Sequence, residues 1–249
     1  MEALRLENSA NIVQFNQGAE IQAAKKTVPS GVRVPVADGE NLYSNRAFRT
    51  PVSPLSVDEY KRLRDYFFGA KNYFYSMQTN KRNYLYIVMS VNLMRRAGDM
   101  VRLRVGDVVA EDGSFRDHVI IREQKTGKVA RVYLNDACRE ALVEYLNGMD
   151  SYAMSDWLFE NFKRPGEHMS VDGMRRMLKR TAEKLGMDIH IGTHSLRKTL
   201  PHHAMSHGAN AEDEVAISQL LNHSNIKTTY HYIGREQEEL DNFVQSHAL

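Results

Sequence analysis

The sequence predicts a mainly α-helical fold with one small antiparallel β-sheet, an α+β class. Three observations lead to this prediction. Apolar residues recur at helical spacing in most segments after residue 56. One stretch, DHVIIREQKTGKVARVYLN, has two runs rich in β-branched residues joined by a turn at Thr126-Gly127, which predicts a β-hairpin. The stretch before residue 56 contains several helix breakers and no long amphipathic helix.

The first predicted helix begins after Ser56. Ser56 is a suitable N-cap, and Glu59, three residues later, completes a capping box. Tyr60, Leu63 and Phe67 then recur at helical spacing. On similar periodicity we expect further helices over residues 80–94, 95–109, 136–149, 170–186, 195–208, 211–223 and 235–247. The segment 80–94 is apolar on most sides, which predicts a buried helix.

The amino-terminal part of the chain differs in character from the rest. Residues 1–55 are polar and weakly periodic, and we expect an arm or linker there with one short strand around residues 32–36. Residues 56–249 are expected to form one domain that ends in a helix. The hydrophobic content of 42% is enough for a buried core.

Composition excludes several classes of protein. The single cysteine, Cys138, excludes an intramolecular disulfide and a zinc site built from several cysteines. The sequence has neither a run of about 18 apolar residues nor the pattern of a secretory signal, so a cytoplasmic protein is expected. The net charge is only +2, but basic residues gather in RRAGDMVRLR and RRMLKR, which indicates a polyanionic partner.

Four separate pieces of the sequence carry side chains suited to one task, the attack of a tyrosine on a phosphodiester. Arginines supply rigid, permanently charged donors for phosphate oxygens. A tyrosine can become covalently attached to its substrate, a lysine on a turn can give a proton to the leaving oxygen, and histidines can carry protons. The candidates are Arg96, Lys125, His194 and Arg197 (three residues apart on a predicted helix), His223 and Tyr232.

These residues stand in motifs that resemble, in order and spacing, the catalytic domain of the tyrosine recombinases, or phage integrase family. The motifs are RNYLYIVMSVN…RRAGDMVRLRVGDV, KTGK, IGTHSLRKT and LLNHSNIKTTYHYI, between about residues 56 and 240. The resemblance implies the fold of that domain. It also implies a site-specific recombinase that cuts and rejoins double-stranded DNA through a 3′-phosphotyrosyl link, without a metal or other cofactor.

By that resemblance the catalytic set is Arg96, Lys125, His194, Arg197, His223 and Tyr232. Within this set Tyr232 is the nucleophile, Lys125 is the general acid, and Asp99 supports the helix that follows the first arginine. Tyr230 is the rival for Tyr232. Two residues apart on a helix, the two side chains point in nearly opposite directions, so only one can face the phosphate.

Among the chain's departures from the family's pattern, three affect the candidate site or the domain organisation. Leu93, Met94 and Arg95 stand where Thr-Gly-Leu is common before the first arginine, which makes Arg95 a weaker rival of Arg96. Asn222 replaces a glycine that is usual before the second histidine. A short amino-terminal segment stands in place of the usual core-binding domain. A minimal recombinase, a fragment and a relative with a changed task are therefore alternatives.

Further basic residues are expected to contact DNA phosphates. They are Arg95, Lys128, Arg175, Arg176, Lys179 and Arg180. In the helix over 170–186 the expected buried stripe of Val171, Met174, Leu178 and Leu185 leaves the basic residues outward. The helix over 235–247 has its own apolar stripe, which in the family docks on a neighbouring subunit; the alternative is that it packs on its own domain.

Two other functions stay open at this stage. One is a DNA-binding regulator on the recombinase fold with little or no independent cleavage, suggested by the short amino-terminal segment. The other is a histidine-rich metalloenzyme, which has only the pair His203 and His207, four residues apart, in its favour.

Overall fold

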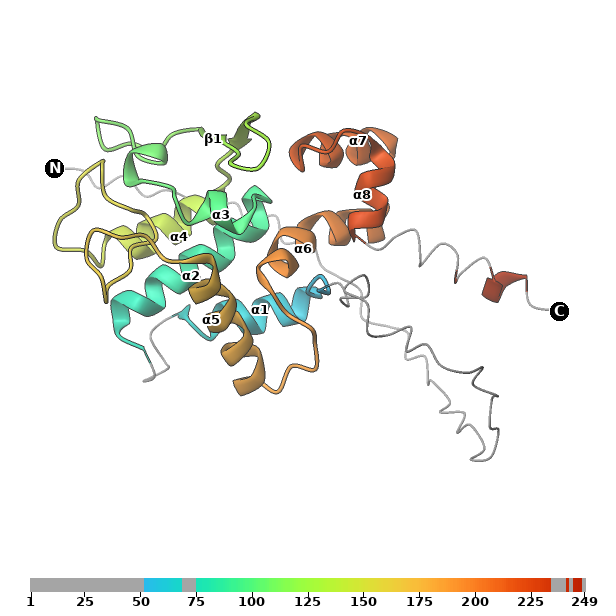
Figure 1. The fold of residues 1–249 in the computed structure, drawn as a ribbon, viewed down its shortest axis with the longest axis horizontal. Helices are drawn as coiled ribbons and strands as arrows, with labels where there is room; N and C mark the ends of the chain where they lie inside the picture. Colours follow the sequence, from blue (N-terminus) through green and yellow to red (C-terminus); the bar gives the residue numbers. More distant parts are fainter. Residues whose placement is uncertain (1–51, 69–74, 234–240, 242–243, 248–249) are drawn as a thin grey trace, which may run out of the picture. The chain divides into compact units, whose positions relative to one another are not determined.

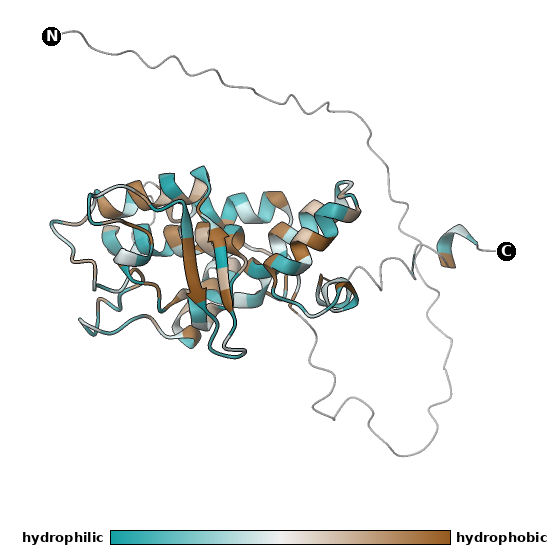
Figure 2. Cartoon of the chain, turned by 90° about the horizontal axis from the view of Figure 1, so that it is seen from above, coloured by the Kyte–Doolittle hydropathy of each residue, from teal (hydrophilic) through white to brown (hydrophobic). Residues whose placement is uncertain are grey.

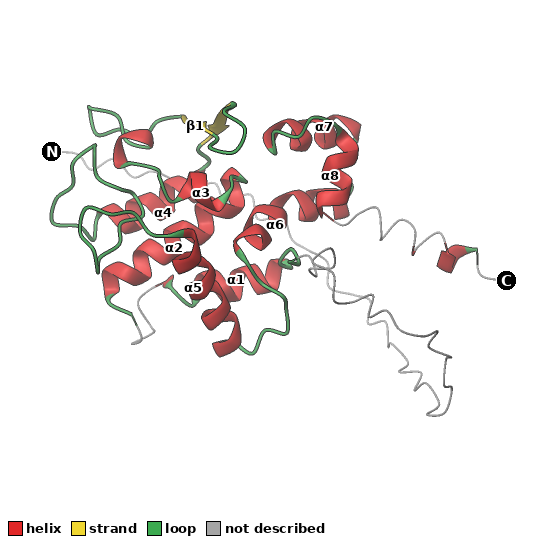
Figure 3. Ribbon diagram, in the orientation of Figure 1, coloured by secondary structure: helices red, strands yellow, loops and turns green. Residues whose placement is uncertain are grey.

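The computed structural model describes residues 52–68, 75–233, 241 and 244–247. This part of the chain is mainly helical with one two-stranded antiparallel sheet, as the sequence predicts (Figure 1; Figure 3). Most of the arm expected over residues 1–55, the strand expected around 32–36 and most of the helix expected over 235–247 lie outside the described residues.

The elements occur in the order expected from the sequence, except that α8 was not among the expected helices. They are α1 (Val57–Asp65), α2 (Met77–Leu93), α3 (Ala97–Met100), the 3-10 helix η2 (Val105–Asp107), β1 (His118–Arg122), β2 (Val129–Tyr133), α4 (Asp136–Leu146), α5 (Val171–Lys184), α6 (Thr193–Ser206), α7 (Ala211–Leu220) and α8 (Ile226–Ile233). None of the helices within the described ranges has the length and apolar character needed to cross a membrane.

The predicted capping box at the start of α1 is confirmed. The Ser56 hydroxyl accepts a hydrogen bond from the Glu59 amide at 3.2 Å, and the Glu59 carboxylate accepts one from the Ser56 amide at 2.8 Å. Both bonds satisfy amides that the first turn of a helix leaves without a partner. The start of α1 is therefore determined locally, by residues three positions apart.

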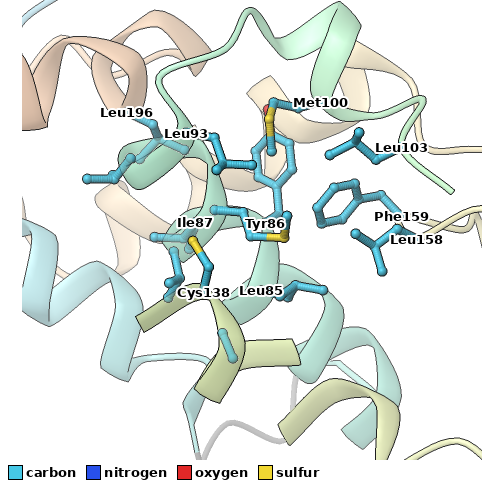
Figure 4. Packing of buried hydrophobic residues seen from close by; sticks show 14 of the residues in the cluster. Leu85, Tyr86, Ile87, Leu93, Met100, Leu103, Cys138, Leu158, Phe159 and Leu196 are labelled. Carbon is cyan, nitrogen blue, oxygen red and sulfur yellow. The ribbon is translucent and has the colours of Figure 1, made fainter. Parts of the chain in front are cut away.

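Helix α2 is the buried centre of the fold, as its apolar sequence predicts. It packs against α4 and α6, and its residues from Leu85 to Val91 are all buried. Tyr86 meets Phe159 edge to face, with ring centroids 5.4 Å apart (Figure 4). This geometry is the favoured one for an aromatic pair. Since α2 is covered by neighbours on more than one side, it gives a rigid base to the segments that follow it.

The predicted hairpin is also confirmed, since β1 and β2 lie side by side (Figure 2) and pair antiparallel. His118 lies opposite Tyr133, and Arg122 lies opposite Val129. Val119 and Ile121 are buried, whereas Ile120 between them is 64% exposed. This alternation follows from the two-residue period of a strand. Gly127 in the turn has φ 69°, a left-handed conformation that glycine adopts without strain.

The helix expected over residues 95–109 is instead two short pieces, α3 and η2. The chain extends at Arg104, and the next two amides donate to another loop: Val105 to the Asp156 carbonyl and Gly106 to the Met154 carbonyl, both at 2.9 Å. These long-range bonds replace the bonds that would continue the helix. The prediction of one helix was wrong because tertiary contacts compete with local helical periodicity here.

The last residues of the predicted arm lie on α6. Leu55 is buried, and its amide donates to the Thr199 hydroxyl at 3.1 Å. Lys198 donates from Nζ to the Val52 carbonyl at 3.2 Å. Residues 52–55 therefore contact α6 at Lys198 and Thr199, directly after the HSLR motif.

Helix α6 joins the large core to a smaller one. It contacts both α2 and α8, and α8 contacts α7 (Figure 1). The smaller core is formed by Met94, Met205, Ile217, Leu221 and Ile233. Pro201 is buried inside α6 and cannot donate to the carbonyl of Arg197 one turn before it, yet the helix continues to Ser206.

Candidate active site

Two helices of the site end in turns with left-handed backbone conformation. Met94, after α2, has φ 53°, and Asn222, after α7, has φ 59°. This conformation costs an L-residue roughly 1–2 kcal/mol, less for asparagine. These are the two positions where the resemblance leads us to expect glycine, so the structure gives a backbone reason for that expectation.

Arg197 is held between these two turns. Its Nε donates to the Met94 carbonyl at 2.9 Å and its Nη2 donates to the Leu221 carbonyl at 2.8 Å. The residue is 2% exposed. Burial lowers the pKa of the guanidinium, but arginine stays protonated in proteins. The two bonds fix the plane of the buried, positively charged guanidinium where α2, α6 and α7 meet.

Arg96 stands at the N-cap of α3, two residues after the Met94 turn. Its side chain is 22% exposed, and Nη1 donates to Oε2 of Glu123 at 2.5 Å. The structure therefore orients this arginine through a carboxylate on the hairpin. Glu123 was not among the site residues expected from the sequence. The signal was present, since Glu123 continues the inward alternation of Val119 and Ile121 just beyond the end of β1.

Tyr232 lies on α8 with its hydroxyl 3.2 Å from Nδ1 of His194 on α6. Burial raises the pKa of the tyrosine, and the charges of Arg197 and Arg96 oppose this effect without cancelling it. The hydroxyl is therefore protonated at neutral pH. Burial lowers the pKa of His194, as do the neighbouring cations, so this imidazole is neutral at the same pH and can accept a proton.

His223 covers another side of the same tyrosine. Its ring meets the Tyr232 ring nearly edge to face, with centroids 5.3 Å apart. Its Nδ1 is 3.0 Å from the Thr229 hydroxyl. Burial, followed by the charges of Arg197 and Arg96, lowers the pKa of His223 to about 4. The ring is therefore neutral at physiological pH, with its orientation set by a threonine of α8.

Tyr230 occupies a different environment, although it lies only two residues away. Its hydroxyl donates to Glu214 on α7 in a short hydrogen bond. Tyr232 instead lies against His194, His223 and Arg197, whose Cζ is 5.4 Å from the centre of its ring. Both rings pack against the smaller core, but the two hydroxyls have different partners, as expected for positions two apart on a helix.

Lys198 is a second residue that sequence analysis missed. Its Nζ lies 5.1 Å from the centre of the Tyr232 ring, and the side chain is largely buried. Burial lowers the pKa of this lysine. The signal was its position four residues after His194, which places both on one face of α6.

The turn of the hairpin carries Lys125 and Lys128, both exposed. Lys125 lies near enough to His194 for its charge to contribute to the lowered pKa of that histidine. Oδ1 of Asp99 accepts a hydrogen bond from the Gln124 amide at 3.0 Å. The acid of α3 therefore holds the turn that presents Lys125.

Arg95 requires a correction. It was expected to contact DNA and was a rival for the role of Arg96, but its side chain is only 1% exposed. Its Nε donates to the Leu93 carbonyl at 2.9 Å, and Nη1 lies 3.4 Å from Oε1 of Glu123. Its Nη2 is buried as well, so Arg95 belongs to the interior behind the site.

The basic residues of α5 are exposed as expected. Arg175 and Arg176 both pair with Asp172 at the start of the helix, and Lys179 lies 3.8 Å from Glu183. Such exposed pairs are weak and can be exchanged for other anions. The buried face differs slightly from the expectation: Val171 is 40% exposed, and Met177, Thr181 and Ala182 are buried together with Met174 and Leu178.

Comparison with known sequences gives a consistent family. The model of the phage integrase family matches residues 55–239. The chain is 29% identical over 164 residues to the probable integrase/recombinase YoeC of Bacillus subtilis, a match that covers 66% of this chain and 83% of that one. It is 31% identical over 155 residues to the tyrosine recombinase XerD of Bradyrhizobium diazoefficiens, covering 57% of this chain and 48% of that one. The chain thus spans about half the length of that recombinase.

Comparison with solved structures gives the fold. The crystal structure of XerA recombinase matches with a TM-score of 0.57 at 22% identity, over 81% of this chain and 66% of that one. A lambda integrase dimer bound to a COC′ core site matches with a TM-score of 0.55 at 17% identity, over 77% and 51% of the two chains. The fold is that of the tyrosine recombinase catalytic domain, as the sequence motifs predicted.

Proposed function

Because the chain belongs to the phage integrase (tyrosine recombinase) family, we propose that it is a site-specific recombinase that cuts and rejoins DNA through a covalent 3′-phosphotyrosyl link to Tyr232. One observation carries this proposal. The hydroxyl of Tyr232 lies 3.2 Å from a neutral histidine, and its ring lies beside a buried arginine that two backbone carbonyls hold in place. A tyrosine with an ordinary packing role does not need this combination.

The arginines would hold the phosphate. Arg197 uses Nε and Nη2 for the protein's own carbonyls, and its third nitrogen, Nη1, would donate to a nonbridging oxygen. Arg96 is partly exposed and supplies a second fork of donors. Both remain charged as negative charge builds up on the phosphate oxygens in the transition state. Donors fixed in advance are effective because they need no reorganisation during the reaction.

The protons move between three side chains. Tyr232 attacks phosphorus while its proton passes to Nδ1 of His194, since the raised pKa of the tyrosine prevents spontaneous ionisation. The bond from phosphorus to the 5′-oxygen breaks, and Lys125 on the hairpin turn gives that oxygen a proton. Rejoining is the reverse: a 5′-hydroxyl attacks the phosphotyrosine, Lys125 takes its proton, and Tyr232 leaves with the proton from His194.

Double-stranded DNA is the proposed partner. Lys128 on the turn and the exposed residues Arg175, Arg176, Lys179 and Arg180 on α5 would contact its phosphates. Residues 56–249 would form the catalytic domain, and residues 1–55 would form an arm or linker. The segment 235–247, most of which lies outside the described residues, would mediate self-association on DNA.

The test is a trapping experiment with nicked duplexes from the DNA that flanks the coding sequence, in buffer with EDTA. The wild-type chain is expected to form a covalent adduct that maps to Tyr232. Tyr232→Phe should form none and still bind DNA, whereas the matched control Tyr230→Phe should retain activity. An adduct on Tyr230 would overturn the assignment. Salt-sensitive binding without any adduct would instead support a DNA-binding regulator.

A further inference from the structure

A fully buried carboxylate lies behind the candidate active site. The side chain of Glu123 is 0% exposed. Its Oε2 accepts a hydrogen bond from Arg96 at 2.5 Å, and its Oε1 lies 3.4 Å from Nη1 of Arg95. An ionised carboxylate in the interior is unfavourable unless cations and donors surround it. Here one acid is shared by two neighbouring arginines, of which only Arg96 is partly exposed toward the site.

The same carboxylate organises the turn that carries Lys125. The Thr126 hydroxyl donates to Oε2 of Glu123 at 2.7 Å. The Glu123 amide donates to the Lys128 carbonyl at 2.9 Å, and its carbonyl accepts from the Gly127 amide at 2.8 Å. Glu123 is thus bonded to the arginine of α3 through one oxygen and to the hairpin turn through the same oxygen and its own backbone.

The charges explain why two arginines are needed. Arg96 and Glu123 alone would form a neutral pair, and the arginine would present little net charge to a phosphate. With Arg95 the three groups carry two positive charges and one negative charge. Arg95 is itself costly to bury, because Nη2 makes no hydrogen bond to any part of the chain that the structure describes. The charge of Glu123 is what compensates that burial.

We propose that Glu123 is a positioning residue that aligns Arg96 with the turn bearing Lys125, and that Arg95 is the counter-charge that leaves Arg96 free to act on the phosphate. This inference rests on the proposed recombinase activity. The effects of Arg95 and Glu123 on cleavage should then depend on each other. Removing either alone leaves an unpaired buried charge or a neutralised Arg96, whereas removing both charges together leaves Arg96 bonded to a neutral amide.

The experiment is a double-mutant cycle on the full chain with Glu123→Gln, Arg95→Leu and the two combined. Single-turnover cleavage of a nicked duplex and DNA affinity are measured separately. Each single variant is expected to cleave on the order of 100-fold more slowly, because misplacement of a catalytic group by about 1 Å has an effect of this size. DNA affinity is expected to stay within about threefold, and the double variant to recover at least about tenfold of the lost rate.

Arg82→Leu is the matched control. Arg82 is also buried, but it donates to the Glu160 carbonyl at 2.7 Å and to the Asn83 side chain, and it makes no bond to a carboxylate among the residues described. It should change stability without the same selective loss of cleavage. If Arg95→Leu does not fold, Glu123→Gln and Arg95→Lys carry the test. The lysine variant, which keeps the charge, is expected to cleave within about tenfold of wild type.

The inference would be overturned if the losses in cleavage rate of the two single variants simply add in the double variant. It would also be overturned if the single variants cleave at the wild-type rate, or if they lose cleavage rate and DNA affinity to the same extent. A wild-type chain that forms no adduct would instead refute the proposed function. In that case the unfolding temperatures of the wild type, the two single variants and the double variant still test the charge pair. Non-additive changes in unfolding temperature would show that Arg95 and Glu123 interact, whether or not the chain cleaves DNA.

Discussion

At the scale of single residues, the hydrogen bonds that hold Arg197 depend on two turns. Each turn has a backbone position that suits glycine better than the residue present. Met94 and Asn222 both adopt positive φ, and the turns they form supply the two carbonyls that accept from Arg197. The two residues differ in what their side chains contribute. Met94 is buried in the smaller core, whereas the Asn222 amide nitrogen is buried without a hydrogen-bond partner among the described residues.

Because of this difference, we expect the two glycine substitutions to change the free energy of unfolding in opposite directions. Asn222→Gly is expected to raise the free energy of unfolding by about 1 kcal/mol, since it relieves the left-handed strain and removes an unsatisfied buried group. Met94→Gly is expected to lower it, because losing a buried methionine side chain costs about 2–5 kcal/mol and outweighs the relief of strain. Urea unfolding of the two variants measures both. A destabilised Asn222→Gly would contradict this account of the turn.

At the scale of elements, the hairpin turn is predicted to act on the leaving group. Lys125→Ala should cleave an ordinary phosphodiester slowly, because the departing 5′-oxygen then lacks a proton donor. The same variant should recover on a substrate with a bridging 5′-phosphorothiolate, whose sulfur leaves without a proton. Lys128→Ala, on the same turn, is the control and should show no selective recovery. If Lys125→Ala cleaves both substrates equally slowly, Lys125 contacts the phosphate and does not act as the proton donor.

The exposed face of α5 gives a second prediction at this scale. Replacing Arg175, Arg176 and Lys179 by alanine should weaken binding to any duplex and reduce the slope of log affinity against log salt by roughly 1 for each lost phosphate contact. Lys61→Ala, an exposed lysine on α1, is the control. Fluorescence anisotropy over a salt series measures both quantities. An unchanged slope in the triple variant would mean that α5 does not face DNA.

At the scale of the whole molecule, the neutral histidines of the site link folding to pH. His223 has a pKa of about 4 when folded against an ordinary value of 6.5. Between these values the unfolded chain binds a proton that the folded chain does not, so stability falls as pH falls from about 6.5 to about 4. The lowered pKa of His194 acts in the same direction. Urea unfolding at pH 7 and pH 5 should show a smaller loss for His223→Gln than for wild type; an equal loss would contradict the assignment.

Much of the fold could be predicted because its signals are local. The capping box at Ser56 and Glu59 involves residues three apart, and the hairpin around Gly127 follows from strand alternation and one turn. The types of residue in the candidate site were also readable from sequence, since few reactions call for two arginines, two histidines, a lysine and a tyrosine in this order. Features of this kind can be predicted without knowing which other segments each one contacts.

Other features were decided only by tertiary structure. The amides of Val105 and Gly106 find partners in a distant loop, and this breaks a segment that has helical periodicity. Arg95 looks like a surface cation in the sequence, yet it is buried because Glu123 on the hairpin supplies its counter-charge. The sequence determined which groups are present and the local turns that carry them. The tertiary structure decided which charges meet, because the free energy of a buried charge depends on partners that are remote along the chain.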